Sequence, residues 1–117
     1  MSLLDTTQLS LEAAMRGSML RQSLLTNNLA NADTPGYQRE DVNFQSQLAN
    51  ALQTGQSPSA VNFSPAVQSG VVSADGNGVS GEQDSASLAE NGLLYENLTE
   101  IAAQREQILK TAMGPMS

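Results

Sequence analysis

The polar side chains that stand out in this sequence are amides close to residue 30, and the chemistry that they offer is hydrogen bonding. Residues 24–37 read LLTNNLANADTPGY, with Asn27, Asn28 and Asn31 close together. Asparagine amides compete with helical backbone hydrogen bonds, so they favour caps, turns or partners. Three of them near one helix end indicate contacts beyond the helix itself. The chemistry that they offer is hydrogen bonding to another segment or another chain.

A sharp turn is predicted directly after these amides. Pro35 disfavours the α region for Thr34 and fixes its own φ, and Gly36 accepts a positive φ. The sequence therefore predicts a type II turn over residues 33–36 that carries Tyr37. The helix must end before this turn.

Catalytic chemistry finds little support in the sequence. The chain contains no cysteine and no histidine, which excludes a thiol nucleophile, an imidazole base and the usual zinc ligand sets. Catalysis would depend on carboxylates, Lys110 or hydroxyl groups. The twelve acidic residues are scattered, without paired or metal-loop spacing. We therefore predict no enzyme activity, no cofactor, no metal site and no small-molecule substrate.

Charge and hydropathy restrict the kinds of partner. The net charge is −7, and phosphate binding needs clustered basic residues. The five basic residues are dispersed, at Arg16, Arg21, Arg39, Arg105 and Lys110. We therefore expect no nucleic-acid binding. No apolar run of about 20 residues could span a membrane, and MSLLDTTQLS lacks the basic and apolar regions of a cleavable secretory signal.

The elements that must position the amides begin with a long helix from about Thr7 to Ala32. This helix has two apolar walls. One wall holds Leu11, Ala14, Met15, Met19, Leu25 and Leu29, and the roughly opposite wall holds Leu9, Ala13, Leu20 and Leu24. One wall can pack against a C-terminal helix. For the other we predict neighbouring copies or other subunits in preference to a single larger core, because this short chain has little apolar sequence left.

A second long helix is predicted to begin between Glu82 and Leu88 and to end near Met113, before the stop signal Gly114-Pro115. Its start leaves two alternatives open, an N-cap at Asp84 or Ser85 and a specialised interface there. Its apolar stripe has near-heptad spacing, which indicates coiled-coil packing. The stripe contains Leu94, Tyr95, Leu98, Ile101, Ala102, Ile108, Leu109, Ala112 and Met113.

Arg105 interrupts this stripe, and three interpretations stay open. It can extend its charge to the edge of the helix pair, form an ion pair with an acid on the first helix, or set the register between subunits.

The middle of the chain, residues 37–87, is predicted to be flexible and partly β. Tyr37, Phe44, Leu48 and Leu52 are compatible with a short helical or irregular segment against the first helix. Phe44 is the expected anchor, and either core packing or an interface fits it and Tyr37. Residues 54–87 are rich in Ser, Gly and Pro, with a candidate extended pair at Val71, Val72 and Val79. This segment is predicted to order on assembly, with a passive linker as the alternative.

Together these elements predict an all-α fold, an antiparallel pair of long N- and C-terminal helices. We expect three segments: residues 1–36 with the first helix and its turn, residues 37–87 as the connection, and residues 88–117 as the second helix. The first and last form one helical assembly domain. Because the core is small and disulfides are absent, self-association is the expected source of stability.

The run NNLANADTPGY at residues 27–37 resembles the signature of the bacterial flagellar axial proteins, the rod and hook family. The matching positions are Asn27, Asn28, Leu29, Ala30, Asn31, Thr34, Pro35, Gly36 and Tyr37. Two further runs, DGNGV at 75–79 and LAENGLLYENL at 88–98, resemble C-terminal landmarks of a short proximal rod member. A second short rod protein of the family shares this architecture.

The resemblance implies a structural subunit of the flagellar basal body. Such a subunit is exported uncleaved by the flagellar type III pathway and polymerises into the periplasmic proximal rod, which transmits torque from the motor to the hook. The implied partners are copies of itself, other rod proteins, the adaptor FliE, the membrane ring and the export gate. The alternative is a soluble helical adaptor or export chaperone.

The expected assembly residues lie in the motif and in both apolar elements beyond it. They are Asn27, Asn28, Leu29, Asn31, Thr34, Pro35, Gly36, Tyr37, Phe44, Leu94, Tyr95, Leu98 and Ile101.

Overall fold

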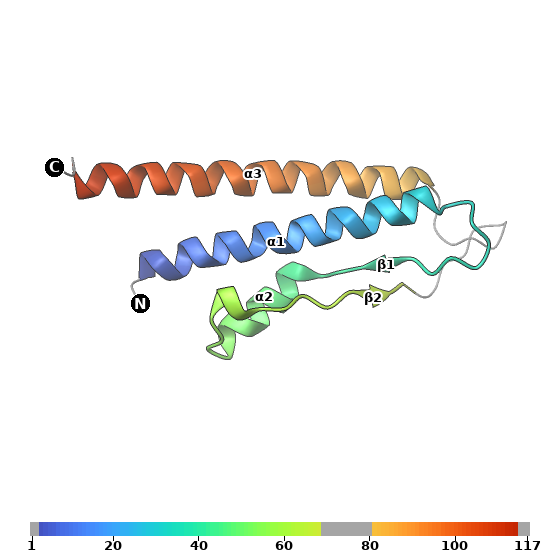
Figure 1. Cartoon of the computed structure of the whole chain (residues 1–117), viewed down its shortest axis with the longest axis horizontal. Coiled ribbons are helices and arrows are strands. Elements are labelled where there is room, and N and C mark those ends of the chain that lie inside the picture. Colours follow the sequence, from blue (N-terminus) through green and yellow to red (C-terminus); the bar gives the residue numbers. More distant parts are fainter. Residues whose placement is uncertain (1–2, 69–80, 115–117) are drawn as a thin grey trace.

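The computed structural model describes residues 3–68 and 81–114, with side chains described from residue 6 onward. It is elongated, 64 × 28 × 16 Å, because two long helices run along its length (Figure 1). In chain order the elements are α1 (Leu3–Ala30), β1 (Glu40–Asp41), α2 (Phe44–Gln53), the 3-10 turn η1 (Pro58–Ala60), β2 (Ala66–Val67) and α3 (Gly81–Met113). The predicted antiparallel helix pair is confirmed.

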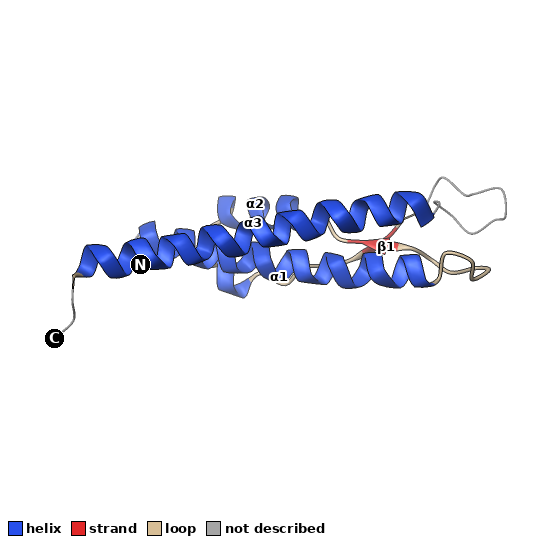
Figure 2. Ribbon diagram, turned by 90° about the horizontal axis from the view of Figure 1, so that it is seen from above, coloured by secondary structure: helices blue, strands red, loops and turns tan. Residues whose placement is uncertain are grey.

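The elements form three layers, with α1 in the centre (Figure 1). On one side α1 packs against α3, and on the other it packs against α2, η1 and β1. Of the described elements, only α1 contacts α3. Figure 2, viewed from above, shows both long helices running lengthwise, with the C-terminal end of α3 extending past the start of α1. No other helix or strand within residues 3–68 and 81–114 therefore covers α3.

The second apolar wall of α1 is covered within the chain. Ala13 on α1 forms a buried cluster with Leu48 and Ala51 of α2 and with Val61, which follows η1. The prediction that neighbouring copies or other subunits cover this wall is wrong at Ala13. The physical reason is the spacing in α2, because Phe44, Leu48 and Ala51 fall on one face of a short helix and bring enough apolar surface to close the wall.

Phe44 lies in the interior of the chain, so the alternative of core packing describes it. Its ring meets the ring of Phe63 edge to face, with centroids 6.2 Å apart. It also packs against Gly17 of α1, where an added Cβ would lie 2.5 Å from the Cβ of Phe44. Gly17 thus lets α2 approach α1 closely, a contact that the sequence pattern did not reveal.

A small antiparallel ladder joins the two halves of the middle segment. Glu40 pairs with Val67 and Asp41 pairs with Ala66. The backbone N–H of Gln68 also donates to the carbonyl oxygen of Arg39 over 2.7 Å. The extended pair predicted at Val71, Val72 and Val79 lies outside the described residues. The observed ladder lies earlier in the chain and runs beside α1.

Candidate functional site

Asn28 connects the end of α1 to β1. Its side chain is 1% exposed, and its Nδ2 donates to the carbonyl oxygen of Glu40 over 2.8 Å. Its Oδ1 accepts from the backbone N–H of Glu40 over 3.1 Å. One amide therefore satisfies both backbone groups of Glu40, as a neighbouring strand would. The hydrogen bonds of this predicted site residue lie within the chain.

Replacing Asn28 with leucine should leave both backbone groups of Glu40 without a partner. We expect a loss of about 2 kcal/mol in the free energy of unfolding, because a buried polar group left unsatisfied costs roughly 1–3 kcal/mol. Urea unfolding followed by circular dichroism measures this loss. Asn27→Leu is the matched control, since Asn27 is exposed. Equal stabilities of the two variants would contradict this role for Asn28.

Asn31 closes the C-terminal end of α1. Its Nδ2 donates to the carbonyl oxygen of Asn27 over 2.9 Å, and its Oδ1 accepts from the hydroxyl of Thr34 over 3.2 Å. The backbone N–H of Thr34 donates to the carbonyl oxygen of Asn31. Helix ends leave carbonyl groups unpaired, and these local bonds occupy some of them. The three asparagines therefore differ, since one is buried, one is a local cap and one is exposed.

The turn after α1 is displaced by one residue from the prediction. The backbone N–H of Tyr37 donates to the carbonyl oxygen of Thr34 over 3.2 Å, so the turn spans Thr34 to Tyr37. Pro35 takes its second position, and Gly36, with φ of 79°, takes its third. These are the positions that a type II turn gives to proline and glycine. The predicted range of 33–36 would have put Gly36 in the fourth position.

Gly36→Val places a β-branched residue in a left-handed backbone conformation. We expect a cost of about 1–2 kcal/mol in unfolding free energy from backbone strain alone, because an added Cβ meets nothing within 4 Å. Assembly should suffer more than isolated helicity. Comparing helical content with rod yield for this variant checks both parts, and a normal rod yield would contradict the second.

An ion pair joins the post-turn segment to the first turn of α3. Arg39 donates through its Nη2 to Oδ1 of Asp84, which is fully buried. The prediction that Asp84 or Ser85 caps α3 is wrong, because the helix already begins at Gly81 and both residues lie inside it. Burial of this carboxylate requires a charged partner, and Arg39 supplies it.

Two further arginines hold the middle segment onto α1. Arg21 forms a two-pronged pair with Asp41, at 2.9 and 3.2 Å. Arg16 donates to the carbonyl oxygens of Pro58 and Val61 and lies 5.8 Å from the ring centroid of Phe63. In the sequence these arginines are recognisable only as dispersed charges. They lie on α1, whose second apolar wall must be covered by another segment. This is the sequence feature that could have indicated their contacts with the middle segment.

Asn91 forms a buried polar contact between the two long helices. Its Nδ2 donates to the carbonyl oxygen of Ser18 and to Oε1 of Gln22, both over 2.8 Å. The hydroxyl of Ser18 donates back to Oδ1 of Asn91 over 3.3 Å. A satisfied polar group inside an apolar helix seam fixes the register, because any shift would leave it unpaired. This residue was not predicted, although it lies inside the LAENGLLYENL run.

The predicted stripe of α3 is only partly in the seam. Leu94, Tyr95 and Leu98 are half-buried, whereas Ile101 is 45% exposed. Ile108 and Met113 are exposed as well, so the predicted coiled-coil packing does not extend along the whole stripe. The buried positions 84 and 91 define a narrower inward face than the broad side assumed from the sequence. α3 therefore carries large apolar residues that this packing leaves exposed.

Arg105 is half-buried, and its Nε has no hydrogen-bond partner among the described residues. The ion pairs in the described ranges involve Arg21 and Arg39, so the interpretation that pairs Arg105 with an acid on α1 is not supported there.

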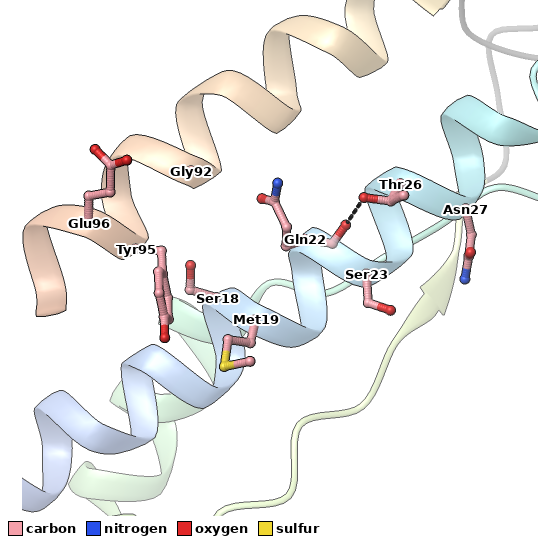
Figure 3. Close-up of a pocket in the computed structure, with 9 residues that line it drawn as sticks. All are labelled: Ser18, Met19, Gln22, Ser23, Thr26, Asn27, Gly92, Tyr95 and Glu96. Carbon is pink, nitrogen blue, oxygen red and sulfur yellow. Dashed lines mark hydrogen bonds between the residues drawn. The ribbon is translucent and has the colours of Figure 1, made fainter.

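A groove of about 550 Å³ lies between α1 and α3, open on one side. Figure 3 shows Tyr95 reaching from α3 toward Ser18 and Met19 of α1, with Glu96 on the outer rim. Within residues 3–68 and 81–114 there is no group of acidic, cysteine or histidine side chains that could hold a metal ion. The same ranges contain no helix with the length and apolarity that a membrane crossing requires.

The fold and these contacts define a class of protein, an elongated helical hairpin whose polar groups hold its own segments in place. The family model described as flagella basal body rod protein matches residues 11–38, which span most of α1 and the turn after it.

Three relatives extend this match across most of the chain, and all are named flagellar basal body rod protein FlgB. The one from Bacillus subtilis is 33% identical over 97% of this chain and 97% of its own length. The one from Salmonella typhimurium is 31% identical over 80% of this chain and 83% of its own length. The one from Yersinia enterocolitica is 35% identical, over 72% and 77% respectively.

The chain belongs to the FlgB family of flagellar basal body rod proteins. The predicted family is thereby confirmed, and the relatives favour FlgB over FlgC, the other short rod protein. This is a structural family and not an enzymatic one.

Proposed function

We propose that this chain polymerises into the proximal part of the flagellar rod and there transmits torque from the motor to the hook. The observation that carries the proposal is the set of large apolar side chains left exposed on helices whose other sides are covered. They are Met19 and Leu29 on α1 and Leu93, Ile101, Ile108 and Met113 on α3. Such side chains need partners, and an assembling subunit has them on every side.

The internal contacts support a load-bearing role. The post-turn segment is tied to α1 through Asn28 and Arg21, and to α3 through Arg39. A subunit tied together at several points moves as one body, so force applied to one helix reaches the others. Many shallow helix contacts repeated along a tube then give stiffness to the whole assembly.

The assembly residues expected from the sequence fall into two groups under this proposal. Asn28 and Phe44 act indirectly, because they are buried and shape the subunit. Leu29, Pro35, Gly36 and Ile101 have exposed surface and would contact neighbours directly. We assign this assembly domain to residues 1–36 and 88–117, with residues 37–87 as the connection.

The partners in this proposal are other copies of the chain and other rod proteins. More specific partners are proposed on the family resemblance alone. They are the adaptor FliE, the membrane ring and the export gate. Export without a cleaved signal through the flagellar type III pathway belongs to the same proposal.

Electron microscopy of basal bodies from a strain lacking the gene tests the function. We expect membrane rings without a rod, and restoration of the rod by a complementing copy. Intact rods and hooks in the deletion strain would refute the proposal. Crosslinking to neighbours in isolated basal bodies then locates the subunit along the rod.

A further inference from the structure

Gly92 lies inside α3, where glycine costs stability relative to alanine. A Cβ added at Gly92 would meet nothing within 4 Å, so packing within the chain does not require glycine there. Gly17 differs, because Phe44 occupies the space that its side chain would fill. A glycine that its own chain does not need is explained by the close approach of another chain.

The space beside Gly92 is the groove between α1 and α3 (Figure 3). Met19 lines the groove from α1 and is 58% exposed, and Tyr95 lines it from α3. Both side chains offer apolar contact to a segment that enters the groove. Glu96 stands at the rim and forms no ion pair among the described residues. The groove therefore fits a segment that brings an apolar side chain together with a basic one.

The C-terminal tip of α3, residues 108–113, has these properties. It extends past the start of α1 in both views (Figures 1 and 2). Met113 is 69% exposed, and Lys110, three residues earlier, lies on the same side of the helix. Methionine is flexible and fills irregular spaces well.

The charges of the chain favour this tip as the occupant. Three of the five basic residues already have partners within the chain, since Arg16 and Arg21 bind the middle segment and Arg39 binds Asp84 of α3. Arg105 is half-buried beside α1. Within the described residues, Lys110 is the exposed basic side chain without a partner, so it is the cation that a second copy can present to Glu96.

We propose that the groove receives the α3 tip of a second copy, with Met113 beside Gly92 and Met19, and Lys110 beside Glu96. This inference rests on the proposed function and names the contact that would extend the polymer. Groove and tip are different surfaces of one molecule, so the contact is heterologous, and repeating it produces a ring or, if the ring does not close, an open filament.

Disulfide crosslinking tests the contact directly, since the natural chain contains no cysteine. A strain would carry Glu96→Cys together with Lys110→Cys as its only copy. Within one straight helix these positions are about 21 Å apart, far beyond the Cα separation of about 7 Å that a disulfide tolerates. A disulfide between these two positions can therefore form only between two copies.

We expect mild oxidation of isolated basal bodies to produce dimers and longer covalent chains on non-reducing gels. The matched control combines Lys110→Cys with Asp33→Cys, because Asp33 is exposed, lies between α1 and the Thr34–Tyr37 turn, and does not line the groove. Monomers alone from basal bodies that contain this subunit in their rods would overturn the inference and leave the proposed function standing. Absence of the unaltered subunit from rods would instead refute the proposed function.

If the cysteine variant assembles no rods, exchanging the charges of Glu96 and Lys110 tests the contact instead. Glu96→Lys should reduce rod yield by about tenfold, an estimate for loss of one productive contact. The exchange variant, Glu96→Lys with Lys110→Glu, should restore most of that yield. Equal yields from the single and exchanged variants would overturn the inference.

Discussion

Asp84→Ala is expected to destabilise the chain by about 3–5 kcal/mol, because it leaves the guanidinium of Arg39 buried without its counter-charge. Asp84 is fully buried, and the side chain of Arg39 is only 13% exposed. Urea unfolding followed by circular dichroism measures the change in unfolding free energy. The loss should be accompanied by release of the post-turn segment, which faster amide exchange at residues 39–42 would report.

Two further variants separate the ion pair from general damage to α3. Glu82→Ala removes an exposed acid from the same first turn and should cost less than about 1 kcal/mol. Replacing both partners, with Arg39→Met and Asp84→Leu, should recover much of the loss, because no unpaired charge then remains. If Asp84→Ala unfolds at the same urea concentration as Glu82→Ala, the buried pair does not hold the segment.

Gly17→Ala is expected to destabilise the chain by about 1–3 kcal/mol, the usual range for overpacking. The new Cβ would lie 2.5 Å from the Cβ of Phe44 and 2.6 Å from its Cγ, so the base of that side chain must move. Since this contact seats α2 on α1, the variant should expose Phe44 while keeping both long helices. Thermal unfolding and binding of a hydrophobic dye measure the two effects.

Gly92→Ala provides the matched control, because it is the same substitution in the interior of the other long helix. Its added methyl group meets nothing within 4 Å, so helix propensity should raise stability by up to about 1 kcal/mol. The two variants are thus expected to have opposite signs. A shared sign would mean that helix propensity, and not contact with Phe44, governs Gly17.

The helix pair was predictable because its signals are local and long. Apolar spacing predicted both helices, and the predicted end of the second at Met113 agrees with the structure. The first begins at Leu3, four residues before the predicted start, since polar residues at a helix end hide its boundary. Pro35 and Gly36 predicted the turn, though not its exact frame.

Much of the candidate site was not predictable, because its contacts join residues far apart in the chain. Arg39 and Asp84 are separated by 45 positions, and Ser18 and Asn91 by 73. No spacing rule within a helix or strand relates such pairs. Asparagines inside the motif were predicted to form contacts beyond the helix, and Asn28 does so, but its partner became visible only in the fold.

The outward position of Ile101 shows a further limit of sequence patterns. A near-heptad stripe indicates which residues are apolar but not where the seam runs when apolar residues cover a broad side. Here buried polar groups at Ser18 and Asn91 fix the seam, and Ile101 lies outside it, 45% exposed. The apolar residues beyond the seam are those left for neighbouring molecules.

The separation of Ser18 and Asn91 along the sequence also determines when α1 and α3 can pair during synthesis. Because the two side chains are 73 positions apart, α1 has nothing to pair with along this seam until most of the chain has been made. Contacts of such long sequence separation form slowly, since a large loop must close first. A newly made chain therefore passes through an interval in which the side of α1 that packs against α3 is unpaired and the hairpin is not yet closed. A narrow export channel can accept a chain in that interval, whereas the closed hairpin would have to be opened again.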